Sequence, residues 1–292
     1  MTQSMLTISP AFDPEGAPRK PGALCIGAQK AGTSWLAQML GQHPQVWIPP
    51  FKEVQYFNFL HVPDHQRWIR WHYRNKPQEI RERHKARGVP MPEALDAYLK
   101  GITGGKMFHN QWYKRVFAPA PVHATPMDFT PEYSTLPAEG VAAVARLLLK
   151  ARVVYLVRDP VDRAISQLRM NLRRAGREPA TVAEWMTELD DPVLFDRGDY
   201  ASYIPRWQAH YPDMLILPFG RIATAPHAVL EAVEDHLGIG PMPYANMGSK
   251  VFANPRGLMP PPELREELSR RMAPQYDFLR SHMGPDFMAE LR

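Results

Sequence analysis

The sequence predicts an α/β fold, with a parallel β-sheet flanked by helices. Two units of strand, polar loop and helix support this prediction. In the first, the apolar run 23–28 is followed by a glycine-bearing loop and by a helix whose apolar positions recur at helical spacing. In the second, the apolar run 152–157 ends at Arg-Asp-Pro, and a helix is expected over 161–174. Strands that alternate with helices pair in parallel, so both units indicate one parallel sheet.

The rest of the chain continues this alternation. The further elements that the pattern predicts are strands at 122–128 and 214–219 and helices at 138–150, 199–210 and 227–237. Residues 60–120 are aromatic and basic and do not fit the sheet, so we interpret them as a helical insertion. We find no repeat and no internal linker. The chain is therefore divided into an N-terminal tail, 1–20, and a single domain, 21–292.

The composition is that of a globular protein. Of the 292 residues, 45% are hydrophobic and 22% charged, which excludes a disordered or fibrous chain. No apolar run is long enough for a signal peptide or a membrane span, so we expect a soluble, cytoplasmic protein. The single cysteine, Cys25, excludes an internal disulfide and a cysteine-based metal cluster, and its apolar neighbours predict a core position.

Positive charge is concentrated in one segment. The net charge of +5 favours anionic ligands in general. Between Arg67 and Arg87, eight Lys or Arg stand against two acidic residues and are interleaved with Trp68 and Trp71. We interpret this segment as a solvated helix anchored by a tryptophan. Nucleic acid is not an expected partner, because no helix-turn-helix, zinc or RNA-recognition signature accompanies the segment.

The loop after the first strand has the spacing of a phosphate-binding loop. Residues 27–34, GAQKAGTS, carry two glycines and then two hydroxyl residues. The glycines allow backbone amides to turn toward one oxyanion, and the helix N-terminus adds partial positive charge. A simple glycine turn would explain Gly27 and Gly32 alone. It would not explain a lysine, a threonine and a serine in the same loop, so a phosphate site is the preferred interpretation.

The position of the lysine separates this loop from that of a nucleotide triphosphatase. In such loops the lysine directly follows the second glycine, where Thr33 stands in this chain. Here Lys30 precedes Gly32 by two residues and would meet a phosphate nearer the root of the loop. This shift favours a donor without a triphosphate and a reaction that requires no metal.

A second cation and hydroxyl follow the second strand. Arg158 ends that strand, and Ser166 lies eight residues further along, on the expected helix. A guanidinium offers a fork of donors to a phosphate, and a serine two helical turns along could reach the same anion. Alone, the pair would be a capping arginine with a solvated serine. Together with the first loop, it indicates a second phosphate site.

A candidate base lies shortly after the first helix. In the segment 50–57, PFKEVQYF, the carboxylate of Glu53 is flanked by apolar and aromatic residues. Such surroundings raise the pKa of a carboxyl group and suit it to accept a proton. A surface Lys–Glu pair is the alternative. Several histidines are scattered without a partner pattern and offer no better candidate: His43, His61, His109 and His123.

The two phosphate motifs, GAQKAGTSW and RDPxxRxxS, resemble those of sulfotransferases that use 3′-phosphoadenosine 5′-phosphosulfate (PAPS). A looser likeness extends over GDYASYIPRW and KVFANP. The resemblance implies a P-loop nucleotide-hydrolase-like fold. It implies that Arg158 and Ser166 bind the 3′-phosphate of the donor. It also implies that the 5′-phosphosulfate end is held by Lys30, Ala31, Gly32, Thr33 and Ser34.

The resemblance implies roles for further residues. The segment resembling KExxxF of the bacterial and Golgi-type branch makes Glu53 the base, with Lys52 as an electrostatic helper. Trp35 matches a position that stacks on adenine in some members, with packing of the first helix as the alternative. The stretch DFTPEY places Asp128, with the helical insertion, on the acceptor side. Phe129 stands where glycan-modifying members often carry lysine.

The implied reaction is transfer of the sulfuryl group of PAPS to a hydroxyl or amine, which leaves adenosine 3′,5′-bisphosphate (PAP). The acceptor, whether a small molecule, a lipid, a saccharide or a peptide, is not fixed by the sequence, and neither is the oligomeric state. A small-molecule kinase that uses ATP and magnesium, with Asp128 as metal ligand, is the alternative enzyme. A non-catalytic nucleotide-binding protein is the third class, but it would lack a base such as Glu53.

Overall fold

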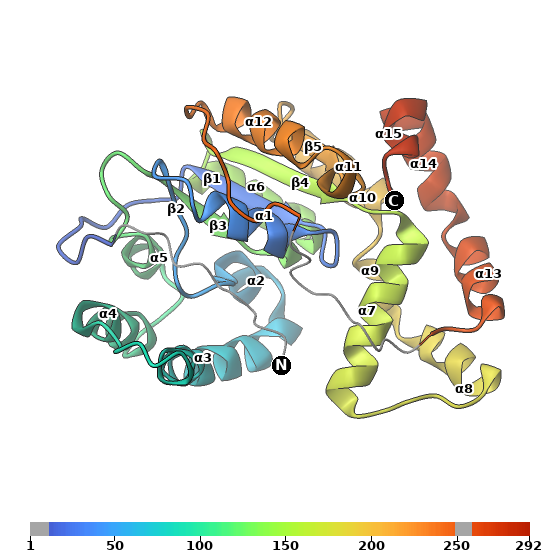
Figure 1. Ribbon diagram of the computed structural model, residues 1–292, viewed down its shortest axis with the longest axis horizontal. Helices are drawn as coiled ribbons and strands as arrows, with labels where there is room; N and C mark the ends of the chain where they lie inside the picture. Colours follow the sequence, from blue (N-terminus) through green and yellow to red (C-terminus); the bar gives the residue numbers. More distant parts are fainter. Residues whose placement is uncertain (1–11, 249–258) are drawn as a thin grey trace.

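A five-stranded sheet forms the centre of the computed structural model, which describes residues 12–248 and 259–292 (Figure 1). The strands are β1 (Ala23–Gly27), β2 (Val46–Trp47), β3 (Thr125–Phe129), β4 (Arg152–Val157) and β5 (Leu215–Pro218). They lie in the order β2-β3-β1-β4-β5, and every neighbouring pair is parallel. The predicted α/β fold with a parallel sheet is therefore confirmed.

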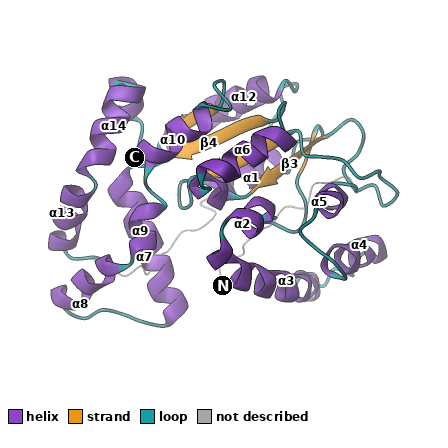
Figure 2. Cartoon of the chain, turned by 180° about the vertical axis from the view of Figure 1, so that it is seen from behind, coloured by secondary structure: helices purple, strands orange, loops and turns teal. Residues whose placement is uncertain are grey.

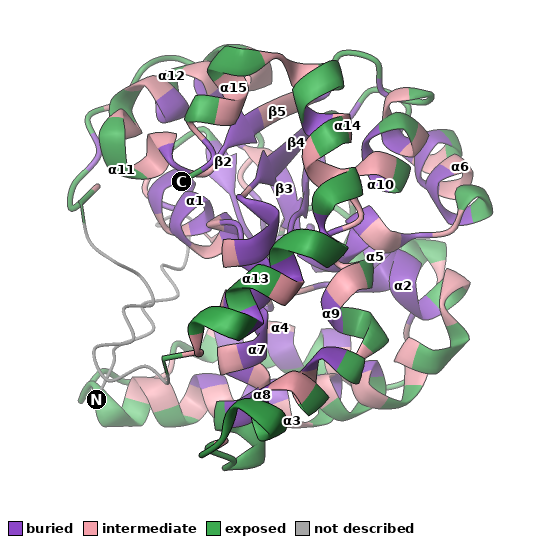
Figure 3. Ribbon diagram, turned by 90° about the vertical axis from the view of Figure 1, so that its right-hand side faces the viewer, coloured by how far each residue is buried: buried purple, intermediate pink, exposed green. Residues whose placement is uncertain are grey.

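Helices cover both faces of the sheet. On one face, α1 (Thr33–Leu40) packs beside α12 (Pro226–Leu237), and α12 also contacts β4 and β5. On the other face, α6 (Ala138–Leu147) contacts α10 (Tyr200–Gln208) (Figures 1 and 2). The strands between these layers are largely buried, whereas the outer surfaces of the helices are exposed (Figure 3).

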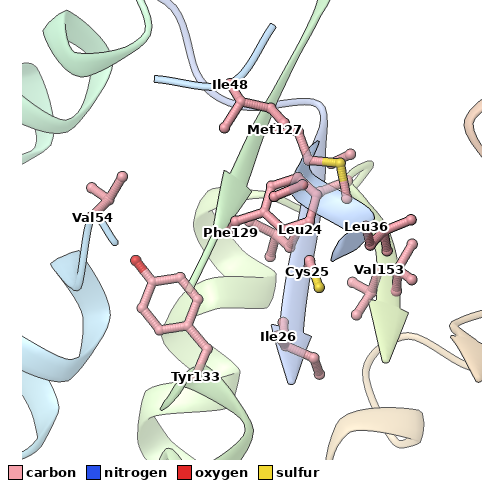
Figure 4. Close-up of a cluster of buried hydrophobic side chains, with 14 of the residues drawn as sticks. Leu24, Cys25, Ile26, Leu36, Ile48, Val54, Met127, Phe129, Tyr133 and Val153 are labelled. Atoms are coloured by element: carbon pink, nitrogen blue, oxygen red, sulfur yellow. The ribbon is translucent and has the colours of Figure 1, made fainter. Parts of the chain in front are cut away.

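The core is densest around β1. Figure 4 shows Cys25 of this strand among apolar side chains of the neighbouring strands, including Phe129 of β3 and Val153 of β4, all of them buried. Burial raises the pKa of the Cys25 thiol to about 12. The cysteine is therefore a core residue, as its apolar neighbours predicted.

The predicted insertion is helical. Between residues 56 and 116 the chain forms α2 (Tyr56–His61), a 3₁₀ turn (Pro63–His65), α3 (Gln66–Ala86), α4 (Glu93–Thr103) and α5 (Asn110–Val116). The basic segment forms most of α3. Trp68 is partly buried against the core, whereas the side chain of Trp71 is 61% exposed. The solvated helix with a tryptophan anchor is thus confirmed, and Trp68 is the anchor.

The remaining helices include α11 (Arg221–Thr224), which packs beside α12 and β5, and a group that lies opposite the insertion in Figure 1. The members of this group are α7 (Pro160–Ala175), α8 (Val182–Thr187), α9 (Pro192–Asp196), α13 (Pro262–Arg271), α14 (Ala273–Met283) and α15 (Pro285–Ala289). The first begins where Asp159 accepts the Asp162 N–H at 3.0 Å and ends at Gly176, whose φ is 62°. Within residues 12–248 and 259–292, none of the helices is both long and apolar enough to span a bilayer.

Some predicted boundaries differ from the observed ones. The strand expected at 122–128 begins only at Thr125, because Ala124 donates to the Pro121 carbonyl at 2.9 Å in a turn that leaves Val122 exposed. The two-residue strand β2 and the helices after residue 260 were not predicted. Two segments assigned from the sequence, the KVFANP stretch and the first eleven residues of the tail, lie outside the described residues.

The strand order predicts a ligand crevice at the carboxyl edge of the sheet. The chain leaves β1 toward β2 on one side and leaves β4 toward β5 on the other, although β1 and β4 are neighbours. Loops that depart in opposite directions leave room between them, and ligands of open parallel sheets bind there. The two predicted phosphate motifs follow β1 and β4, so the topology places them at this crevice.

Candidate active site

The loop after β1 requires glycine at its end. Gly32 has a φ of 93°, and a Cβ at this position would lie 2.5 Å from Cδ1 of Ile222. Lys30 also has a positive φ, of 72°. Among the residues that the structure describes, no side chain caps α1, which starts directly after Gly32. The first amides of the helix therefore remain for a bound anion.

Lys30 lies in a strongly positive environment. Burial and repulsion from four arginines together lower the pKa of its ammonium group to about 8. In order of their effect, these arginines are Arg173, Arg174, Arg158 and Arg163. A phosphate bound in the loop would stabilise the ammonium and reverse the shift. The charge around Lys30 is therefore suited to an anionic ligand.

Arg158 joins the two phosphate motifs. Its guanidinium donates to the Lys30 carbonyl at 3.0 Å and lies 4.4 Å from the ring centroid of Phe219. The hydroxyl of Tyr200 holds the Arg158 backbone, because it accepts the N–H at 3.2 Å and donates to the carbonyl at 3.0 Å. Ser166 is partly exposed on α7. The structure thus brings Arg158 to the loop, whereas its predicted contact with the 3′-phosphate stays a prediction.

The segment after β2 reaches the same crevice. The ammonium of Lys52 donates to the Ser34 hydroxyl at 3.4 Å and lies 5.7 Å from the ring centroid of Phe129. Burial lowers the pKa of Lys52, and the adjacent Glu53 opposes this effect. Lys52 therefore connects the start of α1 with the segment that carries the candidate base.

The carboxyl group of Glu53 has a strongly raised pKa. Burial has the largest effect and repulsion from Glu132 the next largest, and together they raise this pKa to about 7. Lys52, Arg197 and a hydrogen bond from Gln55 lower it and oppose part of the shift. A carboxyl group with a pKa near neutrality can exchange protons at physiological pH. Glu53 thus has the proton affinity that a general base requires.

Three residues that the sequence did not single out complete the site. The Gln55 amide donates to Glu53 at 2.9 Å and also to Glu132, and Arg197 donates to both Glu132 and Gln29. Glu132 could have been noticed, because it belongs to the DFTPEY stretch. No sequence motif around Arg197 pointed to the site, since its partners Glu132 and Gln29 lie 65 and 168 residues away.

A protein-family model described as the sulfotransferase family matches residues 21–243. The chain belongs to the sulfotransferase family. This finding confirms the resemblance inferred from the two motifs. The matched region contains every loop of the crevice described above.

Curated relatives share about a quarter of their aligned residues with this chain. The bifunctional heparan sulfate N-deacetylase/N-sulfotransferase 3 of Mus musculus is 26% identical over an alignment of 246 positions, which covers 76% of this chain and 23% of that protein. The heparan sulfate glucosamine 3-O-sulfotransferase 3B1 of Mus musculus is 25% identical over an alignment of 241 positions, which covers 80% of this chain and 50% of that protein. The chain thus spans half or less of these two relatives.

Solved structures share the fold. A sulfotransferase from Alicyclobacillus acidocaldarius covers 90% of this chain and 95% of its own, with a TM-score of 0.61 and 22% identity. The sulfotransferase domain from the curacin biosynthetic pathway covers 89% of this chain and 99% of its own, with a TM-score of 0.51 and 13% identity. The expected P-loop-like sulfotransferase fold is therefore confirmed.

Asp128 lies in the core rather than at the crevice. Its carboxylate is fully buried and accepts hydroxyl hydrogen bonds from Thr130 at 2.7 Å, Tyr113 at 2.9 Å and Tyr133 at 3.0 Å. Burial raises its pKa to about 6. Three hydroxyl donors occupy the carboxylate, so it stabilises the end of β3. This arrangement argues against the predicted position of Asp128 on the acceptor side and against its use as a magnesium ligand.

The indole of Trp35 packs inside the protein. The side chain is 5% exposed, and Nε1 donates to the Met247 carbonyl at 2.9 Å. In this structure the ring therefore takes the alternative role, packing of the first helix. Of the other loop residues, Ala31 and Thr33 are buried, whereas Ser34 is partly exposed. Their predicted contacts with the donor stay predictions.

Proposed function

We propose that the chain transfers the sulfuryl group of PAPS to a hydroxyl or amine of a saccharide, with Glu53 as the general base. The observation that carries this proposal is the position of Lys52. It contacts Ser34 at the phosphate loop and directly precedes Glu53, whose raised pKa suits a base. In this proposal the anion site and the proton acceptor are neighbours, as transfer to a nucleophile requires.

The residues of the loop fit a phosphosulfate donor. Lys30 and its neighbouring arginines supply positive charge that a phosphate would balance, and the Ncap residue of α1, Gly32, provides no side-chain cap that would compete with it. The residues that would hold PAPS are Lys30, Ala31, Gly32, Thr33, Ser34, Arg158 and Ser166. The donor supplies the sulfuryl group. No metal is needed for this proposal, because lysine and arginine side chains provide the charge that stabilises the leaving phosphate.

Each residue near the transfer has a distinct task. Glu53 takes the proton of the attacking hydroxyl or amine, so that charge does not build up on the nucleophile. Lys30 stabilises the negative charge that develops on the phosphate side. Lys52, placed between Ser34 and Glu53, favours the ionised form of the base, since its positive charge lowers the pKa of Glu53.

A saccharide is the acceptor class that we propose. Two relatives are named for N- and 3-O-sulfation of heparan sulfate, which covers both an amine and a hydroxyl. Phe129 replaces the lysine that many glycan-modifying members carry, but the Lys52 ammonium lies 5.7 Å from its ring centroid. A lysine from another segment of the chain thus lies close to this position.

Location in the cytoplasm stays a prediction, which fractionation of cells expressing a tagged chain would test.

An acceptor screen tests the proposal. The protein would be incubated with sulfur-labelled PAPS and three acceptor types: a desulfated heparan oligosaccharide, a phenol and a tyrosine peptide. We expect the label on the oligosaccharide, with the mass of one sulfo group. Label found only on the phenol or the peptide would overturn the proposed acceptor class but would support PAPS as the donor. Absence of any transfer, together with no binding of PAP, would overturn the function.

Ligand stabilisation separates the sulfotransferase from the kinase. We expect PAP to raise the melting temperature in a concentration-dependent manner, because a ligand that binds only the folded state stabilises it by mass action. ATP with magnesium should raise it much less, since Thr33 occupies the position of the kinase lysine. Differential scanning fluorimetry measures both. The reverse ranking would favour the kinase.

Substitution of Arg158 should weaken donor binding. Arg158→Ala removes a charge-assisted contact with the 3′-phosphate, worth about 1.5–3 kcal/mol, which corresponds to roughly ten- to a hundred-fold in the Kd of PAP. Calorimetric titration measures this change. Adenosine 5′-phosphosulfate, which lacks the 3′-phosphate, is the control and should lose much less affinity. Equal losses would mean that Arg158 acts through its bond to the Lys30 carbonyl.

A further inference from the structure

A continuous series of hydrogen bonds links the phosphate loop with Glu53. Arg197 donates to Gln29 of the loop and, through its other terminal nitrogen, to Oε1 of Glu132. The second oxygen of Glu132 accepts from Gln55 Nε2, which also donates to Glu53 Oε2 at 2.9 Å. We call Gln29, Arg197, Glu132 and Gln55 the relay. Its members come from the segments after β1, α9, β3 and β2.

The orientation of the Gln55 amide follows from its surroundings. Only the nitrogen of the amide can donate to two carboxylates at once, so the nitrogen must point toward Glu53 and Glu132. Gln55 is fully buried, and among the described residues its Oε1 has no hydrogen-bond partner. An unpaired buried carbonyl is unfavourable. Within the described part of the chain, the hydrogen bonds of the amide therefore go to the two carboxylates only.

The two carboxylates have different environments. Glu132 is 4% exposed and pairs with Arg197, as a buried carboxylate requires. Glu53 is partly exposed and has the Gln55 amide and the neighbouring Lys52. Glu132 is therefore held by an ion pair, whereas an uncharged amide holds Glu53.

We propose that Gln55, Glu132 and Arg197 are positioning residues that orient the Glu53 carboxylate and connect that orientation to the phosphate loop through Gln29. This inference rests on the proposed function, in which Glu53 is the base. None of the three would need to touch the donor or the acceptor. They would act through Glu53, and removing the charge of Glu132 or Arg197 should change its proton affinity in a predictable direction.

The sign of each change follows from the charge that is removed. Glu132→Gln removes the negative charge next to Glu53, so the pKa of Glu53 should fall, by about 1 pH unit. Loss of the Gln55 hydrogen bond would act against this fall, but its effect on Glu53 is smaller than that of Glu132. Arg197→Gln removes a positive charge, so the same pKa should rise by about the same amount.

Other titratable and charged groups near this site are not substituted in either variant. They are Lys52, Lys76, Asp64, Asp128, Asp196, His65 and His72. His65 lies close to the ion pair, and burial lowers its pKa. Because these groups are common to both variants and to the wild type, shifts of opposite sign can be assigned to the exchanged charge.

The pKa of Glu53 can be measured without turnover. Protein with carbon-13 in the glutamate carboxyl groups would be titrated by NMR, and the Glu53 signal would be identified by its loss in Glu53→Gln. We expect a lower pKa in Glu132→Gln and a higher one in Arg197→Gln. The matched control is Glu188→Gln, which removes the carboxylate charge from another arginine–glutamate ion pair. In that pair, at the surface, the Arg177 guanidinium donates to the two Glu188 oxygens at 2.6 and 2.9 Å. This control variant should not move the Glu53 signal.

Each outcome decides the proposal. An unchanged pKa in Glu132→Gln, or shifts of the same sign in both variants, would overturn the relay. If Arg197→Gln does not fold, Arg197→Lys keeps the charge and should restore the wild-type value, and Glu132→Gln alone still decides. The pKa of Glu53 could shift in opposite directions in the two variants while the acidic limb of the pH–rate profile stays in place. This result would support the relay and reject Glu53 as the base.

Discussion

Glu53→Gln should lower kcat by roughly a hundred-fold or more while the affinity for PAP is retained. Glutamine keeps the shape of the side chain and a hydrogen-bonding group but cannot accept the proton of the acceptor, and general base catalysis contributes about this much. Rates would be measured with the acceptor that the screen identifies, and PAP binding by calorimetry. A fall in kcat together with an equal loss of PAP affinity would indicate a damaged site and not a missing base.

The pH dependence provides a second readout of the same substitution. Because the pKa of Glu53 is about 7, the wild-type rate should fall as the pH drops below 7, where the carboxyl group becomes protonated. This acidic limb should disappear in Glu53→Gln. A variant that keeps both the limb and the rate would show that another group is the base.

The contribution of Glu53 to the free energy of unfolding should decrease as the pH rises, whereas its contribution to the rate should increase. A carboxyl group with a raised pKa binds its proton more tightly in the folded state, so its contribution to stability is lost as the pH rises through about 4.5 to 7. Glu53→Gln removes this contribution. The difference in melting temperature between pH 5 and pH 8 should therefore be smaller in the variant than in the wild type.

The fold could be predicted because its strands are continuous apolar runs. Residues 23–27 of β1 and 153–157 of β4 are buried, and glycine or proline marks where each strand ends. In contrast, β2 has two residues, Val46 and Trp47, which is too short for any pattern. The helices after residue 260 have few buried positions, so their apolar periodicity is weak.

The site could be predicted only where its residues are close in sequence. Lys30 and Arg158 belong to local motifs at strand ends, and the strand order brings them together. The partners that determine the properties of Glu53 are different. Glu132 lies 77 residues from Gln55, and Arg197 lies 65 residues from Glu132, so only the folded chain shows these contacts. The hydrogen bonds of Asp128 also became visible only in the folded chain, because two of its donors are tyrosines on other elements.

Lys30→Ala should reduce kcat by about a hundred-fold and weaken PAP binding much less. The positive charge of Lys30 is needed most while negative charge develops on the leaving phosphate, and removal of one such stabilising group costs about this factor. The matched variant Lys30→Arg keeps the charge and should retain more activity. Equal losses of turnover and PAP affinity in Lys30→Ala would mean that the lysine only anchors the donor.

Proton uptake tests the electrostatic origin of this role. In the free protein the pKa of Lys30 is about 8, lowered by burial and neighbouring arginines, so part of the population is neutral at pH 8. A bound phosphate should raise this pKa, and PAP binding at pH 8 should therefore take up protons, whereas binding at pH 6.5 should not. Calorimetry in buffers of different ionisation enthalpy measures the uptake. Lys30→Arg, which stays charged, should abolish it, and uptake that persists in this variant would assign the proton to another group.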